Sequence, residues 1–162
     1  MEFTNPLAKC RGMKSIKVKT IDLQYLYRKF GQFDFIKCDI EGMDGEFLKK
    51  LIDSGKPRYF SIEFISPGWL EYLLQCGYQN FRVINNAYFR RFTPTLPIST
   101  IADDKLLWKL MGATSGPFGE DLPGDWVSIV IARDIFLHWK TLKEFDKTLV
   151  LDNWFDLHAK HF

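Results

Sequence analysis

Two carboxylates, Asp39 and Glu41, follow directly on an apolar segment, and their type and spacing suit them to chemistry. Successive side chains of a strand alternate between its faces, so residues two apart share a face. Carboxylates placed in this way could bind a cation, accept hydrogen bonds from a substrate hydroxyl or amine, or act as a general base. The structural alternative is that acidic residues just before a helix complement the helix dipole. Gly42 fits a tight strand-to-helix turn that a Cβ would obstruct.

A third carboxylate, Glu63, stands near the end of the next apolar segment. If the two segments are neighbouring parallel strands, their carboxyl ends bring Glu63 toward Asp39. Like charges so close need a cation, a hydrogen-bond donor or a shared proton. Glu63 could equally face solvent at a sheet edge or pair with a basic side chain, so both interpretations stay open.

The elements that must position these carboxylates alternate between strand and helix. Residues 33–40 have the pattern of a buried strand, residues 43–54 that of a helix with one apolar stripe, and residues 58–65 that of a second buried strand. Short connections indicate a βαβ unit, which builds parallel sheets. A helix opened by Pro67 and a strand over 80–84 form a second unit. In such open α/β sheets, ligands bind beyond the carboxyl ends of the strands.

The other segments are less regular, and residues 85–124 are interrupted by four prolines. Residues 1–15 are expected to be an irregular lead-in, and residues 16–162 one α/β domain. Acids and an aromatic residue in the loop 115–124 could line a pocket mouth, although ordinary turn chemistry is the simpler explanation. The further predicted elements are a strand over 16–22, a helix over 23–30 with Asp22 as its N-cap, a helix over 103–111, a strand over 126–132, and helices over 135–147 and 152–159.

Composition and charge exclude several classes of protein. The chain has 162 residues, 46% of them hydrophobic, and a net charge of +2, which is too small to argue for nucleic-acid or membrane binding. Three scattered cysteines fit neither a disulfide scaffold nor a zinc site, and they indicate a reducing, cytoplasmic setting. The sequence shows no signal peptide and no transmembrane segment. The three histidines do not predict a metal site.

Motifs for other chemistries are missing. None of the 11 glycines forms a G-x-G, and neither a P-loop nor a G-x-S-x-G is present. A nucleotide-binding α/β fold normally carries a glycine-rich turn after its first strand. The sequence therefore predicts the strands and helices of such a fold without that turn.

The stretch 33–42 together with residues 43–48 resembles the signature of the FkbM family of methyltransferases. Residues 18–23 look like the segment before that signature, and residues 115–126 and 154–159 look like a bacterial subgroup, so that the similarity spans roughly residues 16–159. Members of this family use S-adenosylmethionine and mostly methylate hydroxyl oxygens. The resemblance implies a Rossmann-like class I methyltransferase sheet. It also implies that the N-terminal strands, with the glycine-rich loop, are lacking, so the chain looks like the C-terminal part of the domain.

Carried over from the family, Asp39, Glu41 and Gly42 would lie at the cofactor. In a complete enzyme of this kind, Asp39 or Glu63 would orient or deprotonate the acceptor. The expected function is O-methylation of a hydroxyl on a sugar or another small molecule. A divalent cation bridging Asp39 and Glu63 is a less favoured addition. The alternative is a non-catalytic remnant or binding module that keeps the fold without a complete cofactor site. An uncovered sheet edge predicts self-association, and a complementing chain is a further candidate partner.

Overall fold

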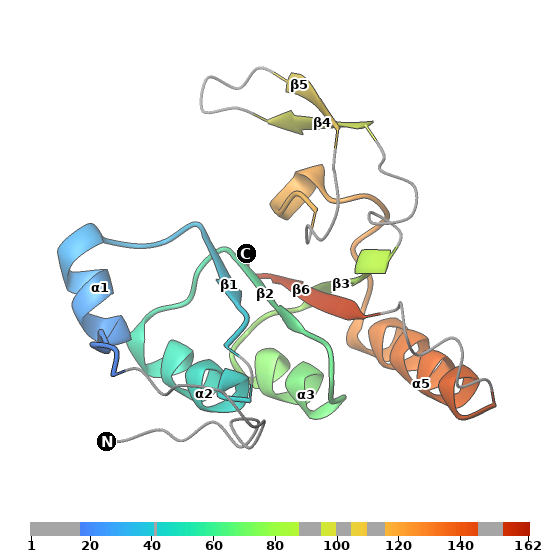
Figure 1. Ribbon diagram of the computed structural model, residues 1–162, viewed down its shortest axis with the longest axis horizontal. Helices are drawn as coiled ribbons and strands as arrows, with labels where there is room; N and C mark the ends of the chain where they lie inside the picture. Colours follow the sequence, from blue (N-terminus) through green and yellow to red (C-terminus); the bar gives the residue numbers. More distant parts are fainter. Residues whose placement is uncertain (1–16, 41, 88–94, 100–104, 110–115, 146–153) are drawn as a thin grey trace.

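The computed structural model describes residues 17–40, 42–87, 95–99, 105–109, 116–145 and 154–162. These residues form a mixed α/β structure, drawn in Figure 1. Among the described residues, no helix is long and apolar enough to cross a membrane. The elements in chain order are α1 (Leu23–Phe30), β1 (Phe35–Cys38), α2 (Asp44–Ser54), β2 (Tyr59–Glu63), α3 (Gly68–Gln75), β3 (Asn80–Asn85), β4 (Thr95–Ser99), β5 (Lys105–Lys109), the 3-10 helix η2 (Gly119–Asp121), α5 (Ile129–Phe145) and β6 (Phe155–Lys160).

The main sheet has the strand order β1-β2-β6-β3. β1 and β2 are parallel, with Cys38 opposite Ile62 in the last register pair. β6 runs antiparallel to both of its neighbours and separates β2 from β3. The carboxyl ends of β1, β2 and β3 therefore share one edge of the sheet with the amino end of β6. Within the described residues, β1 is paired on one side only.

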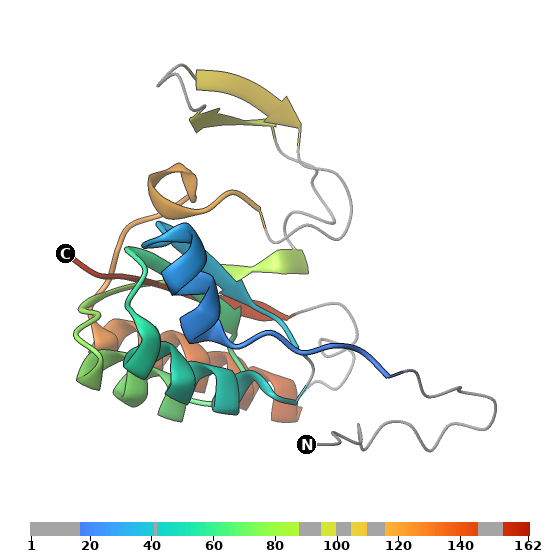
Figure 2. The same ribbon diagram turned by 90° about the vertical axis from the view of Figure 1, so that its left-hand side faces the viewer.

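One face of the sheet carries the main hydrophobic core. α2, α3 and α5 form a layer over this face, as Figure 2 shows. α1 packs against α2 beside the β1 edge. Burying these apolar side chains is the main source of stability for such a layer. The fully or almost fully buried core side chains include Leu48, Leu51, Phe60, Ile62, Leu70, Leu73, Phe81, Leu157 and Ala159.

The opposite face of the sheet carries a row of polar side chains. One cross-strand row runs from Lys37 through Ser61 and His158 to Arg82. Arg82 donates to the carbonyl oxygens of Gly119 and Leu122 at 3.1 and 2.8 Å, so the η2 segment lies over this row. Beyond η2, the β4–β5 hairpin projects away from the sheet (Figures 1 and 2). The hairpin contacts a small second core through Leu96 and Ile98, which pack against Ile84 and Leu122.

The elements around the predicted βαβ units are confirmed, with slightly shorter strands. α1 begins after Asp22, whose carboxylate accepts a hydrogen bond from Gln24 N at 3.3 Å. Gly31 and Gly55 end α1 and α2 with positive φ angles of 79° and 142°. Glycine adopts such backbone angles without steric cost, so it stops each helix where the sequence predicts.

Two predicted elements near the ends of the chain are wrong. Residues 17–22, expected as part of a strand, pair with no other strand, and both Val18 and Ile21 are exposed. The predicted helix over 152–159 is instead strand β6, within the described residues 154–159. Its side chains alternate between the core and the opposite face of the sheet, as successive side chains of a strand do. That insertion makes the sheet mixed, whereas the βαβ pattern alone predicts a parallel one.

Two further predictions in the second half are also wrong. The expected strand over 126–132 gives way to α5, which begins at Ile129, and only an isolated bridge from Val127 to Phe81 has strand pairing. Packing of Ala132 and Phe136 against the core overrides the β-branched composition of this stretch. The expected helix over 103–111 is strand β5 in its described part, because it pairs with β4 as a hairpin.

Candidate functional site

The loop after β1 is held by Asp44, the first residue of α2. Its two carboxylate oxygens accept hydrogen bonds from the backbone N–H groups of Ile40 and Gly42, each at 3.1 Å. Asp44 is buried, and the Cys38 thiol lies 3.5 Å from it. Burial, followed by the nearby Asp44 charge, raises the pKa of Cys38 well above its usual range, so this thiol stays protonated. Asp44 thus fixes the loop that carries the predicted site.

Gly42 has a φ of +89°, and a Cβ built on it would meet no atom within 4 Å. The turn therefore requires glycine for its backbone conformation and not for space. Asp39, three residues earlier, has a side chain that is 55% exposed. Glu41 lies outside the described residues, so the prediction that it shares a face with Asp39 stays a prediction.

Lys37 links the carboxylates at this edge of the sheet. Its Nζ lies 2.9 Å from Asp156 Oδ2 and 3.8 Å from Asp39 Oδ2. Asp156 is almost fully buried and stands opposite Glu63 in the β2–β6 register. Asp39, Asp156 and Glu63 therefore belong to one edge, and the ammonium group offsets the repulsion between two of them.

Glu63 lines a cavity of about 560 Å³ at the carboxyl end of β2. Five aromatic side chains and the base Lys140 share its wall, so it offers apolar surface beside opposite charges. Trp139 and Phe155 meet edge to face at 4.9 Å between ring centroids, which fixes part of this wall. The lining residues are Glu63, Phe64, Ile65, Ser66, Pro67, Phe136, Trp139, Lys140, Trp154 and Phe155.

A second hollow of about 380 Å³ lies beside the loop after β1. Ile40, Met43 and Phe47 give it an apolar side, and Ile40 is exposed at 46%. Its opposite wall is formed by the segment from Thr20 to Leu23. This hollow and the Glu63 cavity have no lining residue in common.

The loop 116–126 lies over the opposite end of the sheet, where β2 begins. Glu120 accepts hydrogen bonds from Tyr59 Oη at 3.0 Å, Trp126 Nε1 at 2.8 Å and Lys160 Nζ at 2.6 Å. Burial opposes ionisation of Glu120, but these three donors lower its pKa to about 2. Tyr59 and Lys160 are register partners at the amino end of β2, so this acid ties the loop down far from Asp39.

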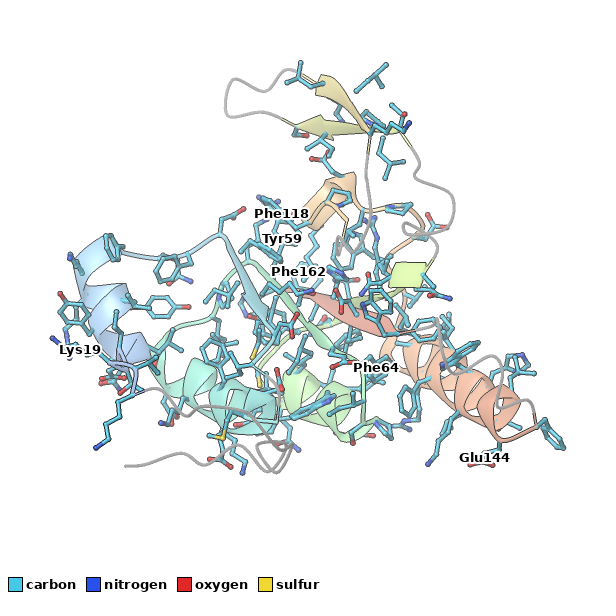
Figure 3. All side chains as sticks on the ribbon, in the orientation of Figure 1. Lys19, Tyr59, Phe64, Phe118, Glu144 and Phe162 are labelled. Carbon is cyan, nitrogen blue, oxygen red and sulfur yellow. The ribbon has the colours of Figure 1, made fainter. Side chains whose placement is uncertain are left out.

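Phe118, in the same loop, stacks on Phe35 with 4.4 Å between ring centroids. Figure 3 shows Phe118 beside Tyr59 under the η2 segment. The Phe118 and Glu120 side chains therefore support the turn-chemistry interpretation of this loop rather than a pocket mouth.

His158 is buried in the polar row, with Nε2 3.5 Å from Ser61 Oγ. Burial, together with the nearby charges of Lys37 and Arg82, lowers its pKa to about 3. The ring is therefore neutral at physiological pH. Within the part of the chain that the structure describes, no three histidine, cysteine or acidic side chains come together as a metal site.

The sequence correctly places Asp39 and Glu63 at the carboxyl ends of neighbouring parallel strands, but it misses Lys37, Asp44 and Asp156. The missed signal for Asp156 is the period-two alternation of Phe155 to Lys160. For Asp44, the signal is an acid two residues after a glycine turn, where its side chain can reach the preceding N–H groups. The catalytic and cofactor roles predicted for Asp39, Glu41, Gly42 and Glu63 stay predictions.

Comparison with known protein families gives a match in the first half of the chain. Residues 6–79 match the model of the methyltransferase FkbM domain. This confirms the predicted family, with the match in the N-terminal part of the chain rather than the C-terminal part of the domain that the resemblance implied. The match ends at residue 79, so it does not cover residues 80–159, which the predicted similarity also included. No curated protein and no solved structure matches the chain.

Proposed function

We propose, on the premise of the match of residues 6–79 to the methyltransferase FkbM domain, that this chain binds S-adenosylmethionine and methylates a hydroxyl oxygen. The observation that supports the proposal most strongly is that two carboxylates stand at the carboxyl ends of neighbouring strands inside the matched region. Asp39 directly follows β1 and Glu63 is the last residue of the adjacent parallel strand β2, so both stand at the carboxyl ends of strands, where ligands bind in open α/β sheets.

The proposed fold is a Rossmann-like class I sheet. Two successive strand–helix units, β1–α2 and β2–α3, place their helices on one face, as right-handed crossovers that continue in one direction across a sheet do. The polar loop after β1 then opens at the sheet edge. Further strands beyond β1 would complete the sheet on its unpaired side.

The hollow beside Ile40 fits the nucleoside part of the cofactor in chemistry. Ile40, Met43 and Phe47 present apolar surface to a flat base, and the backbone around Gly42 is open to a ligand. Asp39, whose side chain is half exposed, stands just before this loop and can accept hydrogen bonds from hydroxyl or amine groups. When bound, S-adenosylmethionine supplies an electrophilic methyl group on a sulfonium.

Glu63 is the proposed base for the acceptor. A hydroxyl group in the 560 Å³ cavity would give its proton to the Glu63 carboxylate as its oxygen is methylated. The aromatic wall would exclude water and orient a small molecule or a sugar ring. Catalysis would depend largely on holding the acceptor oxygen in line with the methyl group. Lys37 would keep the neighbouring Asp156 charge balanced.

Calorimetric titration of S-adenosylmethionine into matched variants tests this proposal. Ile40→Asp would place a charge in the apolar hollow, and we expect affinity to fall at least tenfold. Leu74→Asp is the control, because Leu74 on α3 is similarly exposed, at 42%, and lines neither hollow. Equal affinity of both variants and the original chain would contradict the cofactor site.

The Glu63→Gln variant distinguishes cofactor binding from methyl transfer. We expect this variant to bind the cofactor unchanged while losing methyl transfer to a hydroxyl acceptor by 10²-fold or more. A chain that shows no binding heat at millimolar cofactor would instead fit the non-catalytic binding module.

A further inference from the structure

A hollow of about 420 Å³ lies at the end of the sheet where β1 and β2 begin and β6 ends. We call it the Lys56 hollow. Figure 1 marks this end of the sheet by the C-terminus of the chain, opposite the edge proposed for methyl transfer. Lys56 and Arg58 come from the turn before β2, His161 follows β6, and Asp34 precedes β1. The wall of this hollow therefore holds three bases and one acid, which come from three separate segments of the chain.

Hydrogen bonds fix the backbone that carries these bases. The carbonyl oxygen of Pro57 accepts a hydrogen bond from Tyr78 Oη at 2.9 Å. The carbonyl oxygen of Arg58 accepts one from the backbone N–H of His161 at 2.8 Å, which joins the turn before β2 to the segment after β6. The Tyr78 ring also meets the His161 ring edge to face, with 5.5 Å between centroids. A ligand would find this backbone already ordered, so its binding would cost little conformational entropy there.

Gly77 brings two of the bases close together. Its φ is +92°, and a Cβ built on it would lie 3.2 Å from His161 Nε2 and 3.8 Å from Lys56 Nζ. Both nitrogens therefore lie near one point, and the absence of a side chain at Gly77 leaves them room. An ammonium group donates hydrogen bonds, and an imidazole nitrogen donates when it carries the proton. One anion beside these nitrogens can accept hydrogen bonds from both.

The charges of Lys56 and Arg58 are not balanced within the described part of the chain. No described carboxylate comes within ion-pair distance of either base, although Asp34 shares the same wall. The Arg58 guanidinium lies over the Tyr59 ring, with Cζ 5.1 Å from the ring centroid. Stacking on an aromatic face leaves the N–H groups at the edge of the guanidinium available to an anion. Like charges gathered in one hollow repel each other, and a bound anion would relieve that repulsion.

The set of donors favours a phosphate group. A phosphate monoester has a charge of about −1.5 to −2 at pH 7 and three strong acceptor oxygens. An ammonium, a guanidinium and an imidazole from separate segments can each donate to a different oxygen, whereas a carboxylate offers two oxygens and one charge. The hollow is also larger than one phosphate group requires, and Phe33 and Phe162 add aromatic rings to its wall. These rings provide apolar surface for the organic part of a small ligand.

We propose that the Lys56 hollow binds a small phosphate monoester, with its phosphate group between Lys56, Arg58 and His161. The organic part would lie against Phe33 and Phe162. The Lys56 hollow shares no lining residue with the hollow beside Ile40 or with the Glu63 cavity. The proposal therefore does not depend on the methyltransferase assignment.

Calorimetric titration of phenyl phosphate into the full chain tests the proposal. We expect the original chain to bind it, and Lys56→Gln/Arg58→Gln to bind it at least tenfold more weakly. Arg28→Gln/Lys109→Gln is the matched control, because it removes one lysine and one arginine from exposed positions outside the hollow and should leave affinity unchanged. No binding heat at millimolar phenyl phosphate, or an equal loss in both variants, would overturn the proposal.

Phenyl sulfate tests the selection for phosphate, because it has the same shape but a single negative charge. We expect it to bind at least tenfold more weakly than phenyl phosphate. Equal affinity would overturn the assignment to a phosphate monoester.

Amide proton–nitrogen correlation spectra of the original chain locate the ligand and do not depend on how a variant folds. Phenyl phosphate should shift the signals of residues 56, 58, 77 and 161, and it should leave residues 40 and 42 unchanged. Shifts confined to the loop after β1, or to other segments, would overturn the proposed site, whatever the result with S-adenosylmethionine.

Discussion

The ammonium group of Lys37 lies 2.9 Å from a carboxylate oxygen of Asp156, 119 residues further along the chain. Lys37 belongs to β1, inside the family match, whereas Asp156 belongs to β6, outside it. The ion pair crosses over β2, which separates the two strands in the sheet. The C-terminal strand therefore takes part in building the edge on which Asp39 and Glu63 stand.

Lys37→Met should destabilise the fold, because it leaves the buried Asp156 carboxylate without its ammonium partner. We expect a loss of about 2–4 kcal/mol in the free energy of unfolding, measured by urea denaturation. Lys49→Met is the control. It breaks the exposed pair with Glu46, which water screens, and should cost much less stability than Lys37→Met. If both variants lost an equally small free energy of unfolding, the ion pair between Lys37 and Asp156 would not contribute to stability.

Asp44→Ala should loosen the loop after β1, because the N–H groups of Ile40 and Gly42 lose their acceptors. We expect about 1–3 kcal/mol of lost stability, and Asp44→Asn should lose less because one acceptor oxygen remains. Amide hydrogen exchange would report the loop directly, with faster exchange at residues 40 and 42. Unchanged exchange at those two amides would show that Asp44 does not hold the loop.

Glu120 should make stability depend on pH in the acid range. Its folded pKa of about 2 is lower than the ordinary 4.5, so its contribution is complete above pH 4.5 and is lost as pH falls toward 2. Glu120→Gln should therefore flatten the dependence of unfolding free energy on pH between 4.5 and 2. An undiminished slope in that window would contradict the three hydrogen bonds assigned to Glu120.

His158 should make stability depend on pH in a higher pH range than Glu120 does. Because its folded pKa is lowered to about 3 from 6.5, the unfolded chain binds a proton first as pH falls. The contribution of the neutral ring is complete above pH 6.5 and declines from there toward pH 3. His158→Gln should reduce the slope of unfolding free energy between pH 6.5 and 5, where Glu120 contributes little. The same slope in the variant would mean that the ring is not buried in its neutral form.

The local elements around the site could be predicted because their signals are local. Apolar spacing defines α1 and α2, Asp22 and Gly31 bound α1, and Gly55 with Pro57 ends α2. The placement of Asp39 and Glu63 then follows from two parallel strands and one helix between them. These features need no knowledge of distant residues.

Other features depend on contacts between distant segments. The β-branched run 127–131 favours a strand, but Ala132 and Phe136 pack as a helix against the core. β6 shows its period of two in the sequence, yet nothing local tells that it inserts antiparallel between β2 and β3. Lys37 and Asp156 could not be paired without that insertion.

Hydrogen–deuterium exchange of the full chain, with and without S-adenosylmethionine, tests the central claim most directly. We expect the ligand to slow exchange in residues 20–26 and 39–47, which surround the hollow beside Ile40, and to leave the β4–β5 hairpin unchanged. Exchange that is identical with and without saturating ligand, or protection confined to other segments, would contradict a methyl-donor site at the end of β1.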